Sequence, residues 1–342
     1  MALAGLRQLL RAGILKKRRT LCFRCGTEAA GMRVACPRAM LYPNAMSSSA
    51  VQHRASIDLA RFGAAFGVVW AHAFVSPQDW VGHLALALFL ILTAFLAIGS
   101  MQRAGGRFSW VKRAQRIALP WLFWSLMYRL LDMAISDDPA RFVPLRDPWS
   151  LLIGSTIHLW FLPFVMLASA LVPLIGNRVA GPRDLWLASG VLVAVSLPIL
   201  WLHGAVAMPG PLPQWAFALP AFAYGILAAF GHRFGLVWLP LAAMALISGL
   251  TYAWAGQLWA LQLGFAALLF EAAWRLDLRA RWLPALGQAA FGIYLLHPFF
   301  MLVCYKIFGP QVSPALAALV CFALSWAATV LLLRLPGLRR MV

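Results

Sequence analysis

Three histidines lie in apolar segments of the sequence, where ionisable side chains are rare. His72 is in DLARFGAAFGVVWAHAFV, His158 begins HLWFLPF, and His297 is in GIYLLHP. Ionisable groups within membrane helices are costly, and they usually face a bundle interior or a water-filled cavity. A neutral imidazole suits proton transfer near pH 7. The three residues are therefore candidates for a general base, unless each is a packed histidine bonded to a neighbouring backbone or hydroxyl group.

A basic pair forms the second candidate site. WVKRAQR holds Arg113 and Arg116 three residues apart, so a helix presents both on one face. Two guanidinium groups on one face can clamp phosphates, but cytoplasmic loops also carry such residues as positive anchors, and the residues favour neither reading. With a base deeper in the membrane, a phosphate clamp would suit an enzyme that takes a phosphate-bearing donor from inside and acts on a hydroxyl.

The elements that must position these residues are transmembrane helices. Of the 342 residues, 63% are hydrophobic and 11% are charged, whereas a soluble domain is usually about one-quarter charged. The apolar runs are continuous rather than alternating, which predicts an all-α polytopic membrane protein and disfavours a β-barrel. We expect about ten transmembrane helices, at 59–78, 80–99, 117–135, 151–175, 184–203, 213–231, 235–253, 255–274, 286–306 and 312–334.

Basic residues alternate between the predicted connections. Lys and Arg are concentrated at 100–116, 176–183 and 275–281, whereas 76–81 and 204–212 hold none. This is the positive-inside pattern, and it predicts an even number of spans with both termini in the cytoplasm. The net charge of +19 is thereby explained without nucleic-acid binding, which we do not expect.

Two pairs of charged residues lie within the predicted spans. Glu271 is four residues before Arg275, and Arg129 is three residues before Asp132. Side chains at these spacings are neighbours on a helix. We therefore expect each pair to neutralise itself.

Residues 1–45 differ from the rest of the chain, because they combine nine Lys or Arg residues with one acid, Glu28, and lack a clean apolar span. They are either a basic, acid-poor targeting segment or an extension upstream of a true start at Met46, which is the interpretation we favour. Cys22 and Cys25 form a lone CxxC, which is a weak zinc signal, so we expect no metal site.

Four motifs resemble those of the integral-membrane acyltransferase 3 family, which includes O-acetyltransferases of bacterial surface polysaccharides. The family's opening pattern of Asp, Arg and His is matched by Asp58, Arg61 and His72, and its Arg-x-x-Arg pair is matched by Arg113 and Arg116. Its HLWFL motif is matched by His158 to Leu162, which include Trp160. Its GxxxFxIYLxH motif is matched by Gly287 to His297, which include Tyr294. The resemblance runs from about 54 to 334. One departure lies in the second span, which reads LFLILTAFLAI where the family usually has FFVLSGFLI.

The resemblance implies a reaction and roles for these residues. The reaction is transfer of an acyl group, acetyl by analogy, from cytoplasmic acyl-CoA to a hydroxyl of a cell-envelope carbohydrate or lipid-linked glycan at the bacterial inner membrane. His72 would be the catalytic histidine, either as a general base or as the carrier of the acyl group. The other expected roles are CoA-phosphate binding by Arg113 and Arg116, and support by Asp58, Arg61, His158, Trp160, Tyr294 and His297.

Acyl-CoA is expected as a co-substrate, and no permanently bound cofactor is expected. The rival interpretation is a polytopic transporter or flippase for a glycan or small metabolite, because ten spans with buried histidines also suit that class. No matching pair of broken helices is visible in two halves of the sequence. The acceptor, the acyl group and the oligomeric state are not readable from the residues.

Overall fold

The computed structural model describes residues 54–74, 80–135, 157–309 and 311–342. The chain divides into two units, Met1–Ser49 and Ala50–Val342, and every described residue belongs to the second. The basic segment 1–45 with its CxxC, and the start proposed at Met46, lie outside the described residues.

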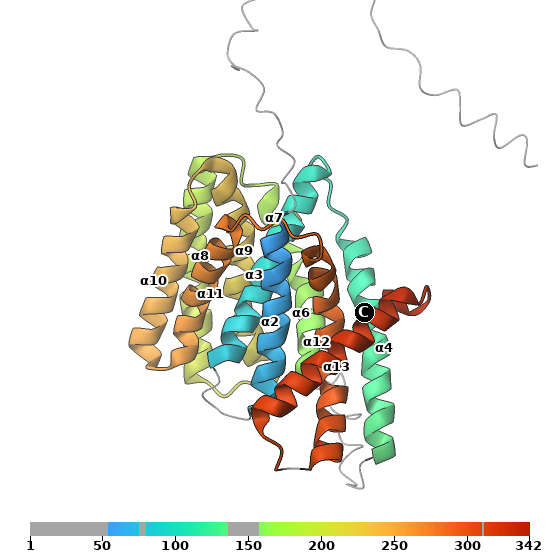
Figure 1. Cartoon of the computed structure of the whole chain (residues 1–342). Helices are drawn as coiled ribbons and strands as arrows, with labels where there is room; N and C mark the ends of the chain where they lie inside the picture. Colours follow the sequence, from blue (N-terminus) through green and yellow to red (C-terminus); the bar gives the residue numbers. More distant parts are fainter. Residues whose placement is uncertain (1–53, 75–79, 136–156, 310) are drawn as a thin grey trace, which may run out of the picture. The chain divides into compact units, whose positions relative to one another are not determined.

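The described residues form helices and no strands (Figure 1). Their bounds are α2 Ala55–Ala73, α3 Trp80–Arg103, α4 Trp110–Ile135, α6 Phe161–Ala168, α7 Leu171–Gly176, α8 Pro182–Ala205, α9 Leu212–Phe234, α10 Trp238–Ala255, α11 Leu258–Arg275, α12 Leu283–Phe308 and α13 Pro314–Arg334, with the 3-10 turns η2 Ile157–Trp160 and η3 Leu338–Arg340.

The described part of each expected span falls on a helix, but the fourth is interrupted. From residue 157 on, η2, α6 and α7 cover this span, with a break at Ser169 and Ala170. Pro173 has no N–H to donate to the Ser169 carbonyl four residues earlier, and its ring crowds that carbonyl. The Ser169 hydroxyl donates to the Met166 carbonyl at 2.8 Å. The fourth span is therefore a broken helix rather than one rod.

Seven helical spans in the described part of the chain are long and apolar enough to cross a membrane. They are Trp80–Arg103, His158–Gly176, Pro182–Ala205, Leu212–Phe234, Trp238–Ala255, Leu283–Phe308 and Pro314–Arg334. The other long helices described, α2, α4 and α11, carry charged side chains such as Arg61, Arg113 and Glu271. The chain is thus a multi-pass, all-α membrane protein, and crossing by these three helices stays a prediction.

α3 and α9 form the centre of the bundle. The apolar windows of both are 72% buried, whereas those of α8 and α13 are 28% buried. Figure 1 shows α2 beside α3. It also shows α8 and α10 at one side of the bundle and α4 at the other side. Gly67 permits the approach of α2 to α3, because a Cβ there would lie 2.6 Å from the Ala85 Cβ. Such small-residue contacts are typical of helix packing in membranes.

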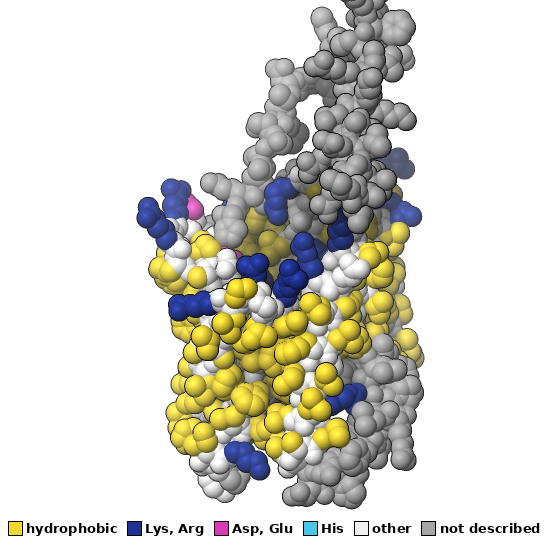
Figure 2. All heavy atoms as spheres, turned by 90° about the vertical axis from the view of Figure 1, so that its right-hand side faces the viewer, with side chains coloured by type: hydrophobic (Ala, Val, Ile, Leu, Met, Phe, Trp, Pro, Cys, Tyr) yellow, Lys and Arg dark blue, Asp and Glu magenta, His cyan; other side chains and the backbone are white. Residues whose placement is uncertain are grey.

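Basic side chains gather at one end of the bundle, which we call the basic end. Figure 2 shows most of the visible Lys and Arg side chains at this end, next to a broad hydrophobic surface. The connections there hold Arg107, Arg178 and Arg279, whereas 206–211 and 256–257 at the other end hold no Lys or Arg. This distribution fits the positive-inside pattern. The cytoplasmic placement of both termini stays a prediction.

Candidate active site

The three histidines singled out from the sequence lie together. The ring centroids of His72 and His297 are 5.0 Å apart, and those of His158 and His297 are 5.2 Å apart. The rings come from α2, η2 and α12. His297 and His158 are 1% and 6% exposed, whereas His72 is exposed. His72 is thus the member that a substrate can reach, and the other two lie behind it.

Two tyrosines complete this group. The Tyr294 hydroxyl donates to the His158 carbonyl, which fixes η2 against α12. The Tyr128 hydroxyl donates to the Leu295 carbonyl at 2.6 Å, and its ring centroid is 5.5 Å from that of His158. Tyr128 therefore connects α4 to the site. We call His72, Tyr128, His158, Tyr294 and His297 the histidine cluster.

The backbone of α12 fixes the hydrogen position on His297. Pro298 has no N–H, so the Tyr294 carbonyl loses its usual helical partner. The Nδ1 atom of His297 lies 2.7 Å from this carbonyl oxygen. A carbonyl can only accept, so Nδ1 carries the hydrogen, and the neutral ring presents Nε2 as an acceptor.

Two imidazole nitrogens in the histidine cluster have no hydrogen-bond partner among the described residues. They are Nε2 of His158 and Nε2 of His297. Other buried polar atoms of the described residues, such as Glu271 Oε2, also have no partner, so what suits these two nitrogens to catalysis is their place beside the exposed His72. Nowhere in the described ranges are three His, Cys, Asp or Glu side chains placed to share a metal ion. The two unpartnered nitrogens beside the exposed His72 suit proton transfer.

The other end of α2 carries a buried carboxylate. Asp58 is 6% exposed, and its Oδ1 lies 4.0 Å from Nη1 of Arg61. A Cβ at Gly287 would press against the Asp58 carboxylate, so this glycine allows α12 to pass close to α2. From Arg61 to His72 is about 16 Å along the helix axis. The first and fourth sequence motifs thus meet where α2 begins, and His72 lies at its far end.

Arg113 and Arg116 lie in the first turns of α4. Arg113 is half-buried with its guanidinium 5.1 Å from the Phe108 ring centroid, and Arg116 is exposed. Neither makes an ion pair within the described ranges. The Trp110 indole donates to the Met166 carbonyl at 2.7 Å, which fixes this end of α4 on α6. The two cations on one helix face therefore remain available to an anion.

Trp160 is two residues after His158 in the sequence, but its ring does not contact the rings of the histidine cluster. Its ring packs on Phe161 and Phe164, and its carbonyl accepts from the Trp215 indole at 3.4 Å. Among the described ring contacts, none joins Trp160 to a histidine of the cluster. Its place is therefore in the packing that holds η2.

The expected pairing of Glu271 with Arg275 is wrong. Glu271 is 3% exposed, its Oε2 lies 3.1 Å from Nε2 of His232, and its Oε1 accepts from the Tyr224 hydroxyl at 3.3 Å. Arg275 ends α11 and is exposed. The buried face of α11 directs the carboxylate to α9, which overrides the favourable spacing. We call Tyr224, His232 and Glu271 the carboxylate cluster.

The expected pair in α4 is also absent, since Arg129 and Asp132, both within the described residues, form no ion pair with each other. Asp132 is exposed and Arg129 is partly buried, so the two side chains leave the helix toward different surroundings.

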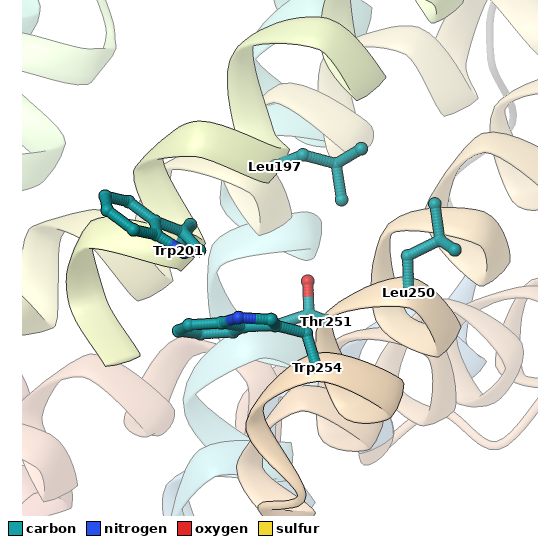
Figure 3. Close-up of a pocket in the computed structure, with 5 residues that line it drawn as sticks. All are labelled: Leu197, Trp201, Leu250, Thr251 and Trp254. Carbon is teal, nitrogen blue, oxygen red and sulfur yellow. The ribbon is translucent and has the colours of Figure 1, made fainter. Parts of the chain in front are cut away.

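A shallow groove lies between α8 and α10, away from these groups. Its volume is about 260 Å³, and Figure 3 shows the two indoles and the Thr251 hydroxyl beside it. The groove is lined by Leu197, Trp201, Leu250, Thr251 and Trp254. No member of the histidine cluster lines it, so it has no part in the candidate site.

Comparisons with known proteins identify the family of the chain. Residues 54–334 match the family described as an acyltransferase domain, which covers most of the chain and every residue of the histidine cluster. Comparisons with curated proteins and with solved structures gave no match. The chain therefore belongs to the acyltransferase 3 family and is a multi-pass membrane acyltransferase.

Proposed function

We propose that this enzyme transfers an acyl group, most simply acetyl, from cytoplasmic acyl-CoA to a hydroxyl of a cell-envelope carbohydrate or lipid-linked glycan in the bacterial inner membrane. The observation that carries the proposal is the histidine cluster. An exposed His72, backed by two buried imidazoles, is an arrangement suited to removing a proton from a hydroxyl.

The basic end supports a CoA thioester as the donor. Arg113 and Arg116 present two cations without carboxylate partners in the described ranges, and phosphates suit such a pair. The donor must then extend from the basic end to the far end of α2, a rise of about 16 Å between Arg61 and His72. CoA carries its phosphates and its thioester at opposite ends of a long, thin arm, which fits this separation.

The reaction needs one proton acceptor near the thioester. His72 takes the proton of the acceptor hydroxyl while the oxygen attacks the thioester carbonyl carbon. The C–O bond of the new ester forms, the C–S bond breaks, and the proton finally reaches the thiolate sulfur to give CoA. A route in which His72 first carries the acyl group uses the same residues.

Labelled acetyl-CoA provides the test. Membranes from cells that express the protein should transfer radiolabelled acetyl from acetyl-CoA to an envelope glycan fraction. Mass spectrometry of glycans from cells with and without the gene should show a difference of one acyl group. Binding of a glycan or metabolite with transport, but with no acylated product, would overturn the proposal in favour of a transporter.

A further inference from the structure

The histidine cluster contains a second base that the reaction above does not use. His297 lies at its centre and is 1% exposed, and its Nε2 has no partner among the described residues. His72 lies on one side of it and His158 on the other, with ring centroids 5.0 and 5.2 Å away. Any proton taken up by His72 therefore appears next to an imidazole able to receive it.

Pro298 is what leaves that nitrogen available. In a regular α-helix the N–H of residue 298 would bond the Tyr294 carbonyl. Proline removes this donor, and Nδ1 of His297 replaces it at 2.7 Å. The hydrogen of the neutral ring is thereby held at Nδ1, and the lone pair is held at Nε2. Neighbouring residues of the sequence thus determine which nitrogen can act.

A second imidazole answers a physical difficulty of the first. When His72 accepts a proton, a cation forms at the edge of a buried apolar bundle, next to the buried ring of His297, where an isolated charge is costly. A neighbouring neutral imidazole with a lone pair can share that proton and spread the charge. The bare Nε2 of His158, which has no partner among the described residues, extends the same environment behind His297.

We propose that His297 is a proton-relay residue of the acyl transfer, with its active tautomer set by Pro298. The proton passes from the acceptor hydroxyl to His72, then to Nε2 of His297, and returns to the thiolate sulfur as CoA leaves. No atom or electron is left unbalanced, because the proton lost by the hydroxyl is the one gained by the sulfur. This inference rests on the proposed acyltransfer reaction.

The alternative is that His297 only caps the carbonyl that Pro298 frees. His297→Asn separates the two, because the Asn amide can keep a donor at the position of Nδ1 but has no basic Nε2. Turnover measured with labelled acetyl-CoA in membranes should fall at least about tenfold, a smaller loss than the 10²- to 10⁴-fold of a group that contacts the reacting hydroxyl, because His297 acts through His72. The KM for acetyl-CoA and the melting temperature should stay near their wild-type values.

The double variant His297→Ala with Pro298→Ala is the matched control. The Pro298→Ala change restores the backbone N–H at this position, so the Tyr294 carbonyl regains a partner without any imidazole. The relay requires that thermal stability recovers relative to His297→Ala while turnover stays low. Recovery of turnover in the double variant, or full turnover in His297→Asn, would overturn the relay. An inactive wild-type protein would instead overturn the proposed acyltransfer.

Discussion

The histidine cluster and the carboxylate cluster are built from similar side chains but differ in what their imidazole nitrogens contact. Both combine histidine and tyrosine inside the same helix bundle. In the carboxylate cluster, Nε2 of His232 lies 3.3 Å from Oε1 and 3.1 Å from Oε2 of Glu271, and Oε1 also accepts from the Tyr224 hydroxyl. Oε2 itself accepts no hydrogen bond among the described residues. In the histidine cluster, Nε2 of both His158 and His297 has no partner among the described residues.

This difference separates a structural polar group from a chemical one. An imidazole that is hydrogen-bonded to a neighbouring side chain adds specificity and rigidity, whereas a buried imidazole nitrogen without a partner costs free energy on folding. The histidine cluster accepts this cost on two nitrogens next to an exposed imidazole. The carboxylate cluster instead joins α9 to α11. Beside it, the Arg54 guanidinium lies over the Trp274 ring, 4.4 Å from the ring centroid. We infer that the first cluster reacts and the second holds helices together.

Removal of His72 should give the largest effect. His72→Ala should lower turnover by about 10²- to 10⁴-fold, the range for a positioned acid–base group. The protein should still be made and inserted, because His72 is exposed and at the end of α2. Transfer from labelled acetyl-CoA in membranes measures turnover, and detergent extraction with size exclusion measures folding.

His232→Ala is the matched control, since it removes a histidine from the carboxylate cluster. This variant should reduce the stability of the protein but leave turnover within about twofold of wild type. A twofold change in turnover corresponds to much less than the roughly 1.4 kcal/mol of a tenfold change. If His72→Ala retained turnover, or if His232→Ala abolished it at unchanged stability, the assignment of the two clusters would be reversed.

Loss of the basic pair should have a smaller and different effect. Arg113→Ala and Arg116→Ala should each raise the KM for acetyl-CoA about tenfold, since a hydrogen bond to a charged group contributes about 1.5–3 kcal/mol. Turnover at saturating donor should change little, because neither residue reaches the histidine cluster. Initial rates across acetyl-CoA concentrations measure both constants.

Arg279→Ala controls for net charge at the same end. Arg279 is exposed, and its Nε donates to Oδ2 of Asp277 at 3.0 Å, so it is already paired. It should leave the KM unchanged. An equal rise in KM for all three variants would identify the basic pair as a membrane anchor rather than a phosphate clamp.

Local sequence could predict the three histidines of the histidine cluster but not Tyr128, which completes it. Apolar runs locate helices, and the positions of His72, His158 and His297 along their spans place the rings at one level. Tyr128 is not among the predicted residues, because its role depends on α4 packing against α12 at Leu295. A tyrosine inside an apolar span was the available signal, since its hydroxyl needs a partner when buried.

Contacts between distant helices also explain the wrong predictions. The spacing of Glu271 and Arg275 allowed an ion pair on one helix, but α11 buries Glu271 against α9 and leaves Arg275 exposed. Spacing describes neighbours on one helix and says nothing about which face another helix covers. By contrast, the tautomer of His297 follows from Pro298, the next residue. It could therefore be predicted from the His297-Pro298 dipeptide alone.

Conservative change in the carboxylate cluster should give the smallest effect on activity. Glu271→Gln keeps the shape of the side chain and removes its charge, so the Tyr224 and His232 contacts become neutral hydrogen bonds. Polar contacts between membrane helices average about 0.6 kcal/mol and reach about 1.7. The melting temperature should therefore fall by a few degrees, and both turnover and the KM for acetyl-CoA should stay within about twofold.

This small effect is the sharpest test of the comparison when it is set beside His297→Asn. Both changes are conservative and both alter a buried polar cluster of the same bundle. If unmatched nitrogens mark chemistry, His297→Asn should lower turnover without lowering stability, and Glu271→Gln should do the opposite. Loss of turnover in both would mean that any disturbance of the bundle stops the enzyme, and the distinction between imidazoles with and without a partner would then carry no information about catalysis.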